Sequence, residues 1–340
     1  MNKQSKKTLP RWVTTVGVLS LVLVLASACS QEQKEQGTTR EAGQKIKATT
    51  TIGMISDIVG KVGGDHVEVT GIMKSGVDPH LYKASQGDMR KLDQADIIFY
   101  NGLHLEGKMQ DILEKIGKQK PVIPVSKNIT QDQLRTGSPE MGAEHDPHIW
   151  FNVQNWMSAV ETVRDELSAL DAVHAEDYKA NAETYLAELR KLDDYTREQI
   201  ASIPEAQRVL VTAHDAFGYF GDAYDIQVKG LQGMSTESEA GSQDVTKLRD
   251  YLVEHKIKAL FVETSVPRKA IDAVIQGAAQ QGHTIRIGGE LYSDAMGKEG
   301  TEEGTYIGMV RHNVNTIVKA LKKRRQNIWG IHRLSFVIYL

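Results

Sequence analysis

Residues 178–192, with the sequence YKANAETYLAELRKL, divide the chain into two halves of similar pattern. Their apolar side chains recur at the 3.6-residue period of a helix that buries one face. No proline occurs between Pro147 and Pro204, so no proline interrupts helical hydrogen bonding in this stretch. The pattern predicts a long helix over residues 174–203 that connects two lobes stiffly, unlike a flexible hinge of glycine and serine.

Strand-like apolar runs alternate with helical segments on both sides of this connector. Such alternation predicts parallel strands that are covered by helices on both faces. We therefore expect an α/β fold of two similar lobes, residues 46–173 and 204–321, each a four-stranded, mainly parallel sheet flanked by helices, joined by the one long connector helix. The predicted strands cover residues 47–52, 67–72, 95–101 and 121–125 in the first lobe, and 208–213, 227–231, 258–263 and 284–289 in the second.

The N-terminus is predicted to be an export signal rather than part of the fold. A basic start without acidic residues is followed by an apolar run over residues 12–25 and by small residues up to Cys29. This run is shorter than the ~20 residues that a membrane-spanning helix needs, so residues 1–28 are predicted to be a signal peptide. The cut would make Cys29 the first residue, in a pattern that resembles a bacterial lipobox. The polar residues 29–45 would then form a flexible tether between the lipid and the fold.

Composition narrows the classes of function. The single cysteine, Cys29, excludes a disulfide within the chain and a cysteine-based zinc or redox site. Beyond the predicted signal peptide the chain carries 37 basic and 44 acidic residues, a net charge of −7 that argues against binding nucleic acid. The tail over residues 322–340 joins a basic cluster to an apolar run that is too short to cross a membrane, and it fits neither lobe.

A repeated tripeptide, Asp-Pro-His, ends at His80 and again at His148. Proline fixes its own φ and keeps the preceding residue extended, so each histidine leaves a rigid turn. One such tripeptide would indicate only a turn, because turns favour aspartate and proline. Two of them favour a metal site, in which a nearby carboxylate can orient each imidazole.

Two further candidates follow predicted strands of the second lobe. His214 comes directly after the strand ending at Ala213, and Asp294 lies just past the strand ending near Gly289. Ligands of open α/β sheets bind outside the carboxyl ends of the strands, which is also where His80 is expected. Asp294 alone would more readily be a helix cap. The four side chains are candidates for one metal site, two from each lobe, while helix caps and core hydrogen bonds are the alternatives at this point.

Seven motifs extend this pattern over roughly residues 46–321: GVDPHLY, NGLHLEG, DPHIWF, VTAHDAFGYF, GLQGMSTESEAG, FVETSVP and ELYSDAMG. In their order and spacing the sequence resembles the metal-binding solute-binding lipoproteins of ABC transporters, the zinc- and manganese-binding cluster A-I group, also called cluster 9 or the lipoprotein adhesin family. Two features depart from common members of that group. The long histidine-rich loop of many zinc-specific members is absent, and His214 stands where many manganese-specific members have glutamate.

The resemblance implies that His80, His148, His214 and Asp294 hold one Mn²⁺ or Zn²⁺ ion as cargo. It implies delivery to an ABC permease and its ATPase, a lipid anchor on Cys29 at the outer face of the cell membrane or in the periplasm, and a monomer without enzymatic activity. Three imidazole nitrogens and one carboxylate favour zinc in affinity, because manganese lies low in the divalent series.

Two other functions compete with this interpretation. A metal-dependent hydrolase needs an open position for water on the metal, whereas four protein ligands can fill the shell of zinc. The chain has no HExxH, GxSxG or Walker motif either. An adhesin or interaction lipoprotein remains an alternative, but such a role has no need of a four-ligand site.

The predicted lipid on Cys29 can be tested by fractionation. Cys29→Ala removes the acceptor thiol and with it the predicted lipid on that residue. Because stable anchoring depends on more than one acyl chain, we expect the protein to leave the membrane fraction. Immunoblotting of separated membrane and soluble fractions measures the change. A chain that ends at residue 322 is the control and should remain with the membrane. If Cys29→Ala stays membrane-bound, the anchor lies elsewhere, with the tail as the first suspect.

Overall fold

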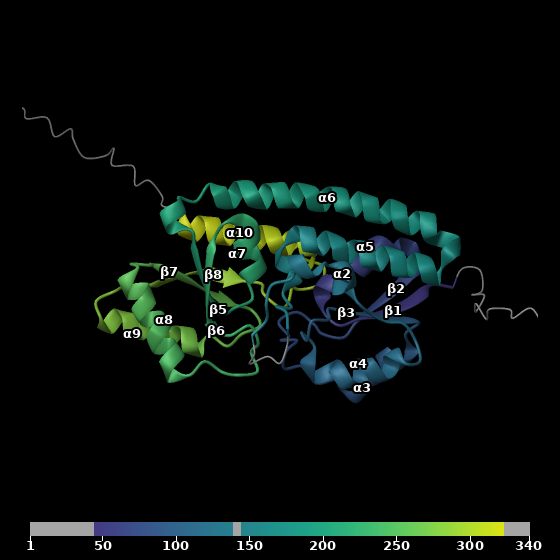
Figure 1. The fold of residues 1–340 in the computed structure, drawn as a ribbon, viewed down its shortest axis with the longest axis horizontal. Coiled ribbons are helices and arrows are strands. Elements are labelled where there is room, and N and C mark those ends of the chain that lie inside the picture. The colour runs from purple at the N-terminus through teal and green to yellow at the C-terminus, as the bar shows by residue number, and fades with distance from the viewer. Residues whose placement is uncertain (1–43, 139–143, 323–340) are drawn as a thin grey trace, which may run out of the picture. The chain divides into compact units, whose positions relative to one another are not determined.

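The structure is a computed structural model that describes residues 44–138 and 144–322 (Figure 1). The predicted signal peptide, Cys29, all but the last two residues of the tether, and the tail beyond residue 322 lie outside the described residues. Among the helices of the described part, none is both long and apolar enough to cross a membrane.

The first sheet has four parallel strands, as the sequence predicts, and their order is β2-β1-β3-β4. Both faces are covered, and β3 buries Ile97, Ile98 and Phe99 in succession, which is the near-continuous apolar run of a strand enclosed on both sides. The strands are β1 (Ile46–Thr50), β2 (Val67–Gly71), β3 (Ile97–Tyr100) and β4 (Val122–Pro124), and the helices between them are α2 (Gly53–Gly63), α3 (Gln86–Gln94) and α4 (Gln110–Gly117).

The second half departs from the expected four-stranded sheet. Its strands form two parallel pairs, β5-β6 and β7-β8. Strands β5 and β7 lie next to each other, but the amides of Ala213 and His214 donate to the carboxylate of Glu263, at 2.7 and 2.9 Å. At the carboxyl end of β5, the side chain of Glu263 therefore takes main-chain donors that could otherwise pair with a neighbouring strand. The elements are β5 (Val209–His214), α7 (Gly218–Tyr224), β6 (Gln227–Gln232), α8 (Ser242–Glu254), β7 (Ala259–Glu263), α9 (Lys269–Gln280), β8 (Arg286–Leu291) and α10 (Tyr306–Leu321).

Two long helices separate these halves in sequence: α5 (Val153–Leu170), whose first turn is capped by Asn152, and α6 (Ala175–Ala201). Helix α6 is one uninterrupted element of 27 residues, and the apolar stripe that predicted it is buried. Figure 1 shows α6 running beside α5 at one end and α10 at the other.

Helix α6 is fastened to both halves by tyrosine hydroxyls. Tyr185 Oη donates to Asp57 on α2 at 2.8 Å, and Tyr195 Oη donates to Asn315 on α10 at 2.6 Å. Bending α6 would break main-chain hydrogen bonds or detach one of these contacts, because a helix without proline, an insertion or a bulge has no natural kink site. We therefore expect the connector to be stiff.

A stiff connector predicts small motions on metal loading. We expect the radius of gyration of the lipid-free protein, about 20 Å for a domain pair of this size, to change by less than about 1 Å when metal is added, because the lobes can only tilt slightly about a packed helix. Small-angle scattering with and without Zn²⁺ measures this. A larger contraction would show that α6 bends or unfolds locally.

Candidate metal centre

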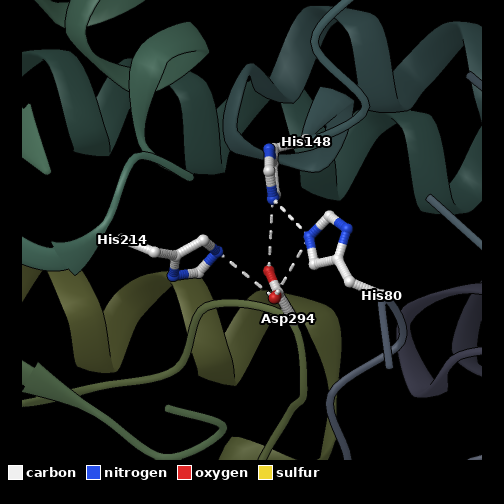
Figure 2. A group of neighbouring side chains, drawn as sticks. All are labelled: His80, His148, His214 and Asp294. Atoms are coloured by element: carbon white, nitrogen blue, oxygen red, sulfur yellow. Dashed lines mark hydrogen bonds and ion pairs between the residues drawn. The ribbon is translucent and has the colours of Figure 1, made fainter. Parts of the chain in front are cut away.

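Four side chains that are far apart in sequence meet in the interior (Figure 2). One ligand atom from each of His80, His148, His214 and Asp294 lies within 4.8 Å of the others. Their relative exposures are 2%, 0%, 0% and 1%, so water does not solvate the group from outside. Among the described residues this is the one group of three or more His, Cys, Asp or Glu side chains with the spacing of metal ligands.

Each side chain is placed by the end of an element. His214 is the last residue of β5, and Asp294 follows β8 by three residues. His80 lies in the loop between β2 and α3, and His148 precedes the short 3₁₀ turn Ile149–Phe151 that leads into α5. The structure brings the four candidates together, and two of them, His214 and Asp294, lie at or just past the end of a strand.

The two Asp-Pro-His turns share a local structure. In each turn Oδ1 of the aspartate accepts the main-chain N–H of the histidine two residues later, at 2.9 Å for His80 and 3.0 Å for His148. Asp146 also accepts from Nδ1 of His148 at 2.8 Å, which leaves Nε2 facing the centre of the group. Arg135 Nε lies 3.4 Å from the other oxygen of Asp146. Asp146 therefore orients the imidazole, as the repeated tripeptide suggested, but Asp78 contacts only the main chain of its histidine.

His214 is oriented by a residue to which the sequence analysis gives no role. Glu263, at the end of β7, accepts from Nδ1 of His214 at 2.6 Å and from the amides of Ala213 and His214. The signal in the sequence was an acidic residue closing an otherwise apolar strand, and Glu263 is indeed buried. Such a carboxylate behind a ligating imidazole fixes its tautomer and raises its basicity.

The carboxylate of Asp294 has no hydrogen-bond partner on either oxygen among the described residues. Its Oδ2 lies 3.2 Å from Nε2 of His214 and 3.7 Å from Nε2 of His80, and its Oδ1 lies 3.5 Å from Nε2 of His148. A buried carboxylate without a hydrogen bond is costly, by several kcal/mol in real proteins, unless a positive charge lies beside it. Three nitrogen donors and one carboxylate around a common point form the donor set that suits Zn²⁺ and admits Mn²⁺. The residues therefore fit a divalent cation.

The charges in the group are coupled. Burial lowers the pKa of His80 to about 3, so this imidazole is neutral near pH 7. Burial also acts against the charged forms of His214 and Asp294. However, Glu263 and Asp294 raise the pKa of His214 well above its ordinary value, and the three imidazoles, His214 first, lower the pKa of Asp294. The raised pKa of His214 favours its charged form, which faces the carboxylates of Glu263 and Asp294.

Residues 49–320 match the family described as zinc-uptake complex component A, periplasmic. The chain belongs to this family. The match spans both halves and all four residues of the group, and it confirms the resemblance inferred from the seven motifs.

Relatives of this member of the zinc-uptake family are similar over most of their length. The manganese-binding lipoprotein MntA of Bacillus subtilis is 52% identical, with 83% of this chain and 92% of the relative covered. The zinc-binding protein TroA of Treponema pallidum is 46% identical over 83% of this chain and 91% of the relative. The manganese ABC transporter substrate-binding lipoprotein PsaA of Streptococcus pneumoniae is 31% identical, with 91% and 98% covered.

Solved structures agree with the fold. The periplasmic zinc-binding protein TroA of Treponema pallidum superposes with a TM-score of 0.80 at 46% identity, covering 82% of this chain and all of the other. The Mn-bound periplasmic metal-binding protein from Candidatus Liberibacter asiaticus superposes with a TM-score of 0.71 at 25% identity, with 82% and 100% covered.

The raised pKa of His214 predicts that metal binding releases a proton. A metal must displace the proton from Nε2 of His214, so affinity is complete above the raised pKa and falls about tenfold per pH unit below it. We expect about one proton released per Zn²⁺ at neutral pH, measured by calorimetry in buffers of different ionisation enthalpy. Glu263→Gln, which removes a charge that raises this pKa, should reduce the number, whereas Glu290→Gln, on the exposed face of β8, should not. An apparent enthalpy equal in all buffers would contradict the assignment.

Proposed function

We propose that this protein is an extracytoplasmic solute-binding protein that captures one Mn²⁺ or Zn²⁺ ion and delivers it to an ABC importer. The observation that carries the proposal is the buried carboxylate of Asp294, which faces three imidazoles and has no hydrogen bond of its own. The named functions of the relatives, manganese and zinc binding and ABC transport, support it.

In this proposal His80 and His148 come from a first lobe, residues 46–173, and His214 and Asp294 from a second lobe, residues 204–321. A cation that binds both pairs links the lobes, so capture stabilises the closed arrangement and a small tilt of one lobe releases the ion. The permease and its ATPase would supply the energy for that tilt. Lipidated Cys29 would hold the monomeric protein at the outer face of the membrane, beside the transporter.

The donor set accounts for the choice between the two metals. If Asp294 binds through one oxygen, the ion has four protein donors, which suits tetrahedral zinc. If both oxygens bind, the ion has five donors, a larger shell that manganese accepts. Both oxygens face imidazoles and neither is occupied by a hydrogen bond. We propose that both ions bind and that zinc binds more tightly, in line with the divalent series.

The same shell argues against catalysis. A catalytic zinc keeps a position open for water, and its ligands typically number three. Here four side chains converge with almost no exposure to solvent, so a substrate has no direct path to the ion. We therefore propose a transport role rather than a hydrolytic one, and no observation favours an adhesin.

Removing one imidazole tests the assignment of ligands. Mutation of a group that only orients a metal ligand typically lowers metal affinity by ~10–100-fold. His148→Ala removes a ligand itself, so it should lower the affinity for Zn²⁺ and for Mn²⁺ by at least this factor. Titration calorimetry measures both ions. His255→Ala, a histidine on the exposed end of α8, is the matched control and should bind as the unaltered protein does. Equal affinities in all three proteins would show that His148 is not a metal ligand.

A further inference from the structure

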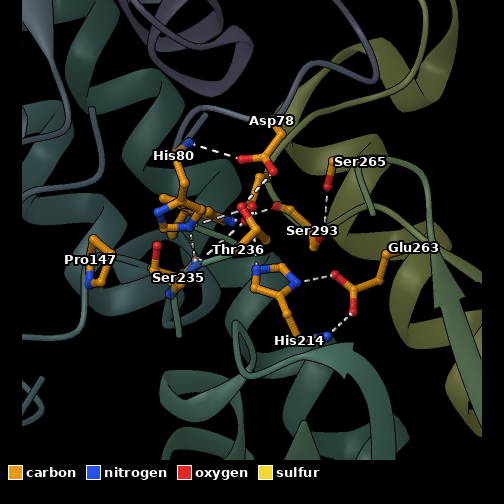
Figure 3. A network of polar contacts seen from close by, with 12 residues as sticks. Asp78, His80, Pro147, His214, Ser235, Thr236, Glu263, Ser265 and Ser293 are labelled. Atoms are coloured by element: carbon orange, nitrogen blue, oxygen red, sulfur yellow. Dashed lines mark hydrogen bonds and ion pairs between the residues drawn. The ribbon is translucent and has the colours of Figure 1, made fainter. Parts of the chain in front are cut away.

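The loop over residues 233–241 joins β6 to α8 beside the metal centre (Figure 3). A turn covers residues 236 and 237, and among the main-chain hydrogen bonds of the described residues none joins residues 234–240 to a neighbouring strand or helix. A loop without such bonds keeps its conformation through its side chains. Most residues of this loop are exposed or half-buried, and Thr236, with 6% exposure, is the exception.

Thr236 connects the loop to the turn that carries His80. Its hydroxyl donates to Oδ2 of Asp78 at 2.6 Å, while Oδ1 of the same carboxylate accepts the main-chain N–H of His80 at 2.9 Å. The bond joins residues 158 positions apart in sequence, from the two halves of the protein. Figure 3 shows Thr236, Asp78 and His80 side by side.

The outer side of the loop makes a second contact between the halves. Lys108 Nζ lies 2.9 Å from Oε2 of Glu237, and both side chains are more than one-third exposed. An exposed ion pair of this kind contributes little to stability. The hydrogen bond of Thr236 to the carboxylate of Asp78 is partly buried and is therefore the stronger of the two attachments.

The other Asp-Pro-His turn is held differently. The carbonyl of Asp146 accepts from Tyr219 on α7 at 2.9 Å, and Trp150 Nε1 donates to the carbonyl of Ser293 at 3.0 Å. Its contacts therefore come from a helix and from two large buried aromatic side chains. The segment before His80 makes one more bond to the second half, from Ser75 Oγ to the carbonyl of Met296 at 2.8 Å, but the Asp-Pro-His turn itself is held from that half by the hydroxyl of Thr236.

We propose that Thr236 is a positioning residue and that the loop over residues 233–241 is a latch that sets the rate of metal release. Its hydroxyl fixes Asp78, Asp78 fixes the main chain of His80, and His80 is thereby held against the ion. When the Thr236–Asp78 bond breaks, the loop and the His80 turn separate, and His80 is the ligand that leaves. This inference rests on the proposed metal-binding function and adds the element that controls release.

The test is the rate of Zn²⁺ release from loaded protein into excess chelator, measured by stopped flow. Thr236→Val keeps the shape and removes the donor, and it should speed release by about 10–100-fold, the factor for losing a hydrogen bond to a charged group. The association rate should remain close to that of the unaltered protein. Thr236→Ser restores the hydroxyl and should restore slow release. Glu239→Gln, exposed on the same loop, is the control.

The outcomes separate the latch from a general loss of structure and from failure of the proposed function. The thermal midpoint of the metal-free protein should be similar for Thr236→Val and Thr236→Ser. Equal release rates for these two variants would overturn the latch, while metal binding itself stands. If Thr236→Val does not fold, hydrogen exchange of the unaltered protein decides. Amides of residues 234–240 that are no better protected in loaded protein than in metal-free protein would overturn the latch. Failure of the unaltered protein to bind Zn²⁺ would overturn the proposed function instead.

Discussion

The buried charge of Asp294 is the constraint on which the centre depends. Both of its oxygens are enclosed and unpaired by hydrogen bonds, at distances of 3.2 to 3.7 Å from three imidazole nitrogens. A chain tolerates such a group only if a counter-charge is present. The raised pKa of His214 favours an imidazolium beside it, and we expect a divalent cation to replace that proton on binding. We therefore expect the carboxylate of Asp294 to face a positive charge both in the metal-free protein and in the metal-loaded protein.

The three imidazoles are held in place by different kinds of contact. Asp146 and Glu263 each fix the Nδ1 of one histidine, so His148 and His214 present Nε2 in a set direction. His80 has no carboxylate on its other ring nitrogen among the hydrogen bonds of the described residues, and its position comes from the main-chain contact with Asp78. The rings of His148 and His214 are therefore fixed directly by hydrogen bonds. The ring of His80 is fixed only through the conformation of its turn. Such a difference lets one ligand move while the others remain in place.

The spacing of the ligands also depends on how the halves are joined. Helix α6 is fastened to α2 and to α10 through Tyr185 and Tyr195. Close to the centre, Tyr306 Oη donates to the carbonyl of Trp150 at 2.7 Å, and the Trp150 indole donates to Ser293, the neighbour of Asp294. These contacts hold the segment after His148 against the segment before Asp294. A ligand pair drawn from two halves can therefore stay within reach of one ion without a wide closing motion.

The sequence by itself determined the alternation of strands and helices, the long connector and the four residues that converge. Apolar periodicity reports which face of a local segment is buried, and a proline turn or a strand end restricts where the next side chain points. Only the tertiary structure decided that Glu263 stands behind His214, that Thr236 reaches Asp78, and that the second half forms two strand pairs instead of one sheet. Those partners lie 49 and 158 residues apart. Local patterns carry no information on such pairings, because the choice of partner depends on how whole elements pack.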